Sequence, residues 1–147
     1  VTNLAAFGVI GLMESPDRPR DQVSDYAGLW NEQPALAGLM TIFLLSLGGF
    51  PPFGGFIAKW YVFTAAMEAG YSWLAIIGVL TSVVSVFFYL RVVVMMYMTP
   101  AAGPMQLPAV PTLAKAALVV SAIIILYLGV LPTQVMNWAA ASIGTIF

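Results

Sequence analysis

The chain has 147 residues, of which 61% are hydrophobic and only 7% are charged, and its formal net charge is −1. Soluble domains are about 25% charged, so this composition excludes an ordinary soluble protein and indicates an integral membrane protein. Five basic residues against six acidic ones exclude a nucleic-acid-binding surface. Because the chain has no Cys and no His, it can form neither a disulfide nor the usual imidazole or thiolate metal sites.

The first predicted element is an apolar helix over residues 1–13, followed by a polar loop over 14–33. Thirteen residues are fewer than the ~20 that cross a bilayer, so we expect residues 1–13 to be the end of a truncated transmembrane helix. The chain would then be a piece of a longer protein. Most of the charged residues lie between Glu14 and Glu32, which makes this loop hydrophilic.

Residues 34–70 are predicted to form one discontinuous transmembrane helix, broken at 48–55. A continuous helix of this length would reach ~54 Å, against a hydrocarbon core of ~30 Å. Two prolines and four glycines in the break cannot continue a regular helix: Gly48, Gly49, Pro51, Pro52, Gly54 and Gly55. Unwound backbone at membrane depth is typical of transporters, and a simple proline kink without function is the alternative.

The second half of the chain contains two further predicted spans. Residues 72–98 form an uninterrupted apolar transmembrane helix, and a loop rich in Pro and Gly follows over 99–111. A further transmembrane helix covers 112–131, where Pro132 ends it. The tail 133–147 is too short to span and contains Trp138, so we expect a short helix at the membrane interface.

Basic residues predict the orientation of these spans. Four of them lie within or beside the loops 14–33 and 99–111: Arg18, Arg20, Arg91 and Lys115. The turn that joins the two spans near residue 70 has none. The positive-inside rule therefore places both loops in the cytoplasm and the C-terminus in the periplasm.

Lys59 is the main candidate for a functional residue. It lies 11 residues before Gly70, which puts it ~16 Å from the outer end of its helix and near the bilayer midplane. A lysine there costs at least ~2.5–3.5 kcal/mol, and removal from water favours its neutral form, which suits a proton relay. Its neighbours one turn away are uncharged, so a partner has to come from another helix. A static buried ion pair and snorkelling along a tilted helix are the alternatives.

Two further basic residues have simpler interpretations. Arg91 lies about seven residues from the cytoplasmic end of its helix, where snorkelling, a structural ion pair and a relay role are all open. Lys115 lies in the first turn of the last span and suits an interfacial anchor. Nothing in the sequence resembles a nucleotide loop, a metal cluster or a catalytic triad, so we expect no cofactor and no metal in this chain.

Four stretches together carry a family resemblance: Asn3–Phe7, Thr41–Lys59, Ser82–Met98 and Leu128–Pro132. They resemble the C-terminal part of the antiporter-like N subunits of bacterial proton-pumping NADH–quinone oxidoreductase (complex I), from the end of helix 11 to helix 14. The sister subunits L and M and the multisubunit Na⁺/H⁺ antiporters share the first two stretches. The Tyr-Leu-Arg-Val-Val-Val sequence within the third points to N.

This resemblance implies an all-α, polytopic transmembrane helix bundle with one discontinuous helix in the bacterial inner membrane. It implies that Lys59, after the matching Gly-Phe-Ile-x-Lys motif, passes protons towards the outer side, driven by quinone reduction elsewhere in the complex. Other subunits would hold NADH, FMN, iron–sulfur clusters and quinone, and the nearest partners would be the sister subunit M and the small subunit K. A Na⁺/H⁺ antiporter subunit and a structural membrane adaptor with a static lysine are the alternatives.

Overall fold

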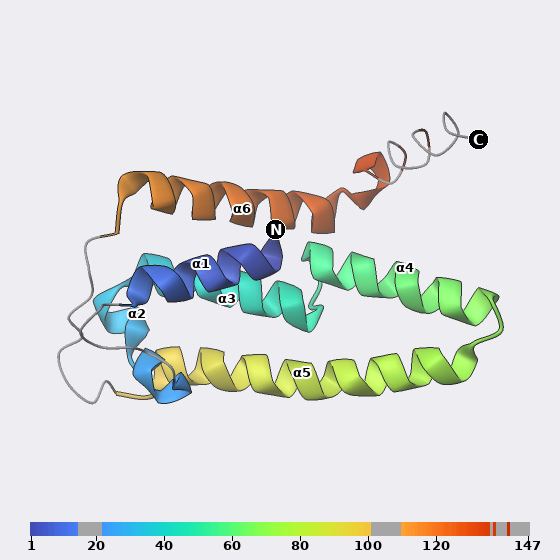
Figure 1. Ribbon diagram of the computed structural model, residues 1–147, viewed down its shortest axis with the longest axis horizontal. Helices are drawn as coiled ribbons and strands as arrows, with labels where there is room; N and C mark the ends of the chain where they lie inside the picture. The colour runs from blue at the N-terminus through green and yellow to red at the C-terminus, as the bar shows by residue number, and fades with distance from the viewer. Residues whose placement is uncertain (15–21, 101–109, 136, 138–140, 142–147) are drawn as a thin grey trace.

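A computed structural model describes residues 1–14, 22–100, 110–135, 137 and 141. Within these residues all regular structure is helical. The helices are α1 (Thr2–Met13), the 3₁₀ turn η1 (Val23–Tyr26), α2 (Leu29–Glu32), α3 (Pro34–Gly48), α4 (Gly54–Glu68), α5 (Ser72–Met98) and α6 (Thr112–Val130). The longer helices run along one axis of the molecule, with α3 and α4 between α5 and α6 (Figure 1).

The helices α3 and α4 lie nearly end to end and are separated by residues 49–53. Pro34 opens α3 at its first turn, where a missing N–H costs nothing. Gly49 ends α3 with a φ of 85°, a left-handed conformation that suits glycine, and two prolines follow. The two helices have 15 residues each, so together they extend ~45 Å, comparable with the ~40 Å of the 27-residue α5.

In the part of the chain that the structure describes, two helices, α5 and α6, are individually long and apolar enough to cross a membrane. The C-terminal ends of α1 and α5 and the N-terminal end of α6 lie at one end of the bundle (Figure 1). The turn between α4 and α5 lies at the opposite end. The connections that follow α1 and α5 therefore leave from the same end.

The segment 22–33 differs from the expected polar loop. It contains η1 and α2, and Tyr26, Ala27 and Leu29 are buried against α3 and α5. The ring of Trp30 stacks on Tyr97 of α5 with 4.9 Å between the ring centroids. The many charged residues in this segment predicted a solvated loop, whereas its few apolar side chains pack against the helix bundle.

Several predicted features lie outside the described residues. These are Arg18 and Arg20, most of the loop 99–111, and most of the tail 133–147, including Trp138. In the part of the tail that the structure describes, residues 132–135 are helical.

The hydrophobic core surrounds α3 and is built by residues of α1, α3, α5 and α6, together with Tyr26 of η1 and Leu29 of α2. Its fully buried members include Met13, Phe43, Met96 and Ile125. In contrast, α4 has no fully buried residue, and much of α5 exposes large apolar side chains. In a membrane, such apolar faces meet lipid or other helices.

Candidate functional site

Lys59 lies on the second turn of α4, and its side chain extends back across the helix break. Its Nζ donates a hydrogen bond of 2.9 Å to the carbonyl oxygen of Gly48, the last residue of α3. The last carbonyls of a helix have no partner within the helix and carry the negative end of its dipole. Within the described residues, the lysine therefore meets the end of the neighbouring half-helix α3, through a backbone carbonyl.

The two half-helices touch through Ser46 and Gly55. The Ser46 side chain is 1% exposed, and its Oγ accepts a hydrogen bond of 3.3 Å from the N–H of Gly55 in the first turn of α4. A Cβ at position 55 would overlap the backbone carbonyl of Ser46, so only glycine fits this approach. Ser46 thus satisfies one of the free N–H groups at the start of α4.

Ser46 was not among the predicted site residues. It is a polar residue in an otherwise apolar stretch of α3, three residues before Gly49. Buried hydroxyls are hydrogen-bonded as a rule, so a serine in this position was a usable signal.

The break also packs against α6. A Cβ at Gly54 would lie 3.1 Å from Cβ of Leu128 and 3.3 Å from the carbonyl oxygen of Ile125. A Cβ at Gly129 would overlap the backbone of Pro52 and Phe53. The glycines on both sides therefore allow the backbone of the break to lie directly on the backbone of α6.

An open groove of about 500 Å³ lies beside Lys59, between α4 and α5. It begins at Gly48 and Gly49 and extends along α4 to Met67, one residue before the end of this helix. Most of its lining is apolar, and the hydroxyl-bearing residues Thr64 and Ser82 also line it. Each hydroxyl donates to a carbonyl of its own helix, which leaves its oxygen able to accept a further hydrogen bond.

The other basic residues lie apart from this groove. Arg91 is exposed on α5 and Lys115 is exposed near the start of α6, and neither lines the groove that holds Lys59. Over residues 1–14, 22–100 and 110–135, the structure contains no group of three His, Cys, Asp or Glu that could hold a metal ion.

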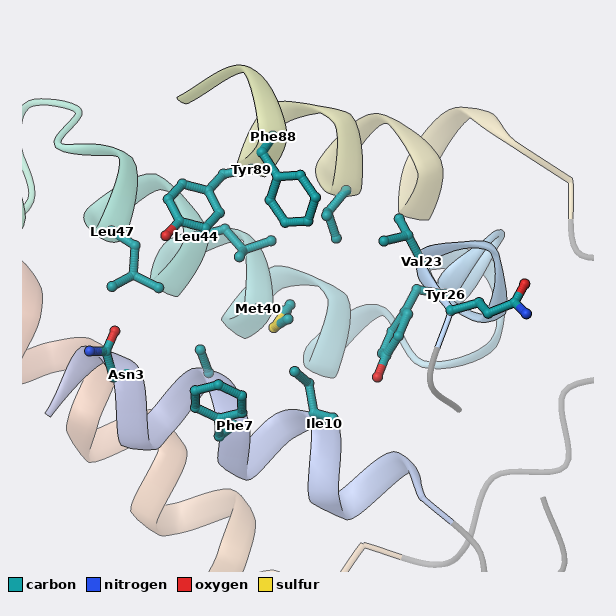
Figure 2. Close-up of a pocket in the computed structure, with 13 residues that line it drawn as sticks. Asn3, Phe7, Ile10, Val23, Tyr26, Met40, Leu44, Leu47, Phe88 and Tyr89 are labelled. Atoms are coloured by element: carbon teal, nitrogen blue, oxygen red, sulfur yellow. The ribbon is translucent and has the colours of Figure 1, made fainter. Parts of the chain in front are cut away.

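A second groove of about 450 Å³ lies between α1, α3 and α5, with η1 at one end. Figure 2 shows its lining, in which Phe7, Met40 and Phe88 face the space. The described residues that line it include no Asp, Glu, Lys or Arg, so this groove holds no counterpart of Lys59.

The comparisons with known proteins concern almost the whole chain. Residues 1–85 match the family described as "NADH:quinone oxidoreductase/Mrp antiporter, TM". NADH-quinone oxidoreductase subunit N of Trichlorobacter lovleyi is 45% identical over 144 residues, which are 98% of this chain and 30% of that protein. Subunit N of Chloroflexus aggregans is 48% identical over 103 residues, 70% of this chain and 21% of its own length. The chain thus spans less than a third of the curated relatives that it matches.

A solved structure agrees with the sequence comparisons. A chain of respiratory complex I from Thermus thermophilus with bound aureothin superimposes with a TM-score of 0.78 at 30% identity. The match covers 92% of this chain and 32% of that one. It confirms the expectation of an all-α, antiporter-like transmembrane helix bundle.

Proposed function

The chain belongs to the transmembrane family shared by NADH:quinone oxidoreductases and Mrp antiporters, and from this we propose that it is the C-terminal part of a proton-translocating N subunit of NADH–quinone oxidoreductase. Relatives named as this subunit match it over 92% and 98% of its length. In this proposal the chain binds no redox centre. NADH, FMN, iron–sulfur clusters and quinone belong to other subunits, and subunits M and K are its neighbours in the bacterial inner membrane.

One observation supports Lys59 as the proton carrier: its amine lies on the carbonyl end of a broken helix and beside a groove. The bond to the Gly48 carbonyl stabilises the ammonium form without a fixed negative charge. A backbone carbonyl accepts a hydrogen bond from the ammonium but carries no full charge. A carboxylate partner would instead hold the ammonium in a static ion pair. This arrangement favours a lysine that exchanges its proton.

The groove gives the transfer a direction. Because it extends from the break to the last turn of α4, a proton released by Lys59 would leave towards the turn between α4 and α5. Water in the groove would find acceptors at Thr64 and Ser82. The turn between α4 and α5 lies at the end opposite to the two loops assigned to the cytoplasm, so we assign it to the periplasmic side. Quinone reduction elsewhere in the complex would drive the step.

A subunit of a multisubunit Na⁺/H⁺ antiporter is the second candidate, because the family description includes the Mrp antiporters. Both functions use a buried ionisable residue in a broken helix. Sodium-driven proton flux in vesicles without NADH would favour the antiporter.

The test measures protons pumped per NADH oxidised in membrane vesicles that carry the complete complex with Lys59→Met. Methionine matches the apolar stem of lysine as far as Cε and removes the titratable amine. We expect a complex that assembles but pumps far fewer protons. Unchanged pumping by a fully assembled complex would show that Lys59 is structural.

Lys115→Met is the matched control. It also removes one lysine from a helix of the same chain, but Lys115 is exposed in the first turn of α6 and lies outside the groove. We expect normal pumping from this variant. If both variants lose pumping equally, the loss reflects the charge of the subunit and the relay proposal fails.

A further inference from the structure

The Lys59 side chain lies directly on Gly49. A Cβ built on Gly49 would be 2.9 Å from Cδ of Lys59, 3.3 Å from Nζ and 3.4 Å from Cε. All three neighbours belong to the lysine, so the far half of its side chain rests on the bare backbone of this residue. The same side chain ends at the Gly48 carbonyl, 2.9 Å from Nζ.

We infer that Gly49 is a positioning residue for Lys59: because Gly49 has no side chain, the lysine can lie across it and its amine can reach the carbonyl end of α3. This inference rests on the proposed function of Lys59. Any larger residue at position 49 would push the flexible lysine aside rather than move the backbone, because the atoms that it meets are the end of a mobile side chain. The amine would then lose its hydrogen bond to Gly48 and turn elsewhere in the groove.

The positive φ of Gly49 also requires glycine at this position. The experiment has to distinguish this backbone effect from the contact with Lys59. The φ of 85° at Gly49 is strained for any residue with a side chain. Gly70 offers a matched control, because it also follows a helix and has a φ of 82°, but nothing lies within 4 Å of a Cβ built there. Gly49→Ala and Gly70→Ala therefore impose the same type of backbone strain, and only Gly49→Ala meets Lys59.

The experiment uses the complete complex in vesicles and compares Gly49→Ala, Gly70→Ala and Lys59→Met. We expect Gly49→Ala to lower proton pumping about tenfold, because displacing a reacting group by ~1 Å can cost up to ~100-fold. The pH profile of the remaining pumping should be displaced, since the amine has lost its carbonyl partner. Gly70→Ala should pump normally with an unchanged profile. Normal pumping by Gly49→Ala would overturn the inference, as would equal impairment of both alanine variants.

A double variant separates the failure of this inference from failure of the proposed function. If Gly49 acts through Lys59, adding Gly49→Ala to Lys59→Met should cause no further loss, because residues that act through one another are not additive. Additive losses would overturn the inference and leave the role of Lys59 intact. Unchanged pumping in Lys59→Met alone would instead refute the proposed function.

Assembly provides a further test if Gly49→Ala does not accumulate. Lys59→Ala removes Cδ, Cε and Nζ, which are the atoms that the new methyl group meets. The double variant Gly49→Ala/Lys59→Ala should then assemble better than Gly49→Ala alone. If assembly is not restored, backbone strain alone requires glycine at this position, and the positioning role is refuted.

Discussion

Replacing Gly55 by alanine should destabilise the junction of the two half-helices. Among the glycines of α3 and α4, Gly55 is the one at which an added Cβ would come nearest to another atom. The added Cβ would overlap the carbonyl group of Ser46, so α4 has to move by roughly 1 Å or more in an interior that packs as densely as a crystal. Overpacking of this type costs about 1–3 kcal/mol. The movement also breaks the bond from the Gly55 N–H to the Ser46 hydroxyl, and an unsatisfied buried donor costs about 1–3 kcal/mol.

The expected loss is therefore about 2–6 kcal/mol in the free energy of unfolding. It can be measured by titrating the purified full-length subunit with SDS in mixed micelles. Gly38→Ala is the matched control, because Gly38 lies within α3 and nothing lies within 4 Å of a Cβ there. Alanine is favoured over glycine inside a helix by roughly 0.5–1 kcal/mol, so this variant should be neutral or slightly more stable.

Two results would refute this reasoning. One is a Gly55→Ala subunit whose unfolding free energy lies within about 0.5 kcal/mol of the parent, which is the range of ordinary surface substitutions. The other is an equal loss in Gly38→Ala, which would show that the assay reports on glycine content and not on the contact between Gly55 and Ser46.

Three further predictions concern stability and can be measured by the same SDS titration. Lys59→Met should change the unfolding free energy by only about 1 kcal/mol. The lost charged hydrogen bond is worth ~1.5–3 kcal/mol, and removing a mid-membrane charge gains back ~2.5–3.5 kcal/mol. A loss of stability above ~3 kcal/mol would show that the two contributions do not offset each other. Ser46→Ala should cost about 1–3 kcal/mol, because it leaves the Gly55 N–H without its acceptor, and a smaller effect would mean that another group accepts this bond. A double-mutant cycle of Trp30 and Tyr97 should yield a coupling of about 0.5–1.5 kcal/mol for their stacked rings, whereas zero coupling would show that the 22–33 segment is held by other contacts.

The sequence was informative about the helices because the signals for starting and stopping them are local. Pro34, the glycines around position 49 and the two prolines that follow mark the ends of α3 and α4 by chain geometry alone. Lys59 was predictable as a candidate site residue because a charge in an apolar helix is costly wherever the helix packs. These signals need no knowledge of the tertiary structure.

The contacts of the site could not be derived in this way. The partner of Lys59 is a backbone carbonyl, which every residue possesses, so no side-chain pattern marks it. The path of residues 49–53 decides that Gly48 and Lys59 face each other, and irregular backbone follows no periodic rule. The same holds for the 22–33 segment, where tertiary packing of Tyr26 and Leu29 overrides a polar composition.

The backbone contact between the break and α6 links two parts of the chain that lie far apart in the sequence. The backbone of Pro52 and Phe53 rests on Gly129, in the last turn of α6. Because the two backbones are in direct contact, a movement of the break should also displace the last turn of α6. A spectroscopic label at the exposed Val130, next to this contact, would therefore report movements of the half-helices during turnover while every residue around Lys59 stays unmodified.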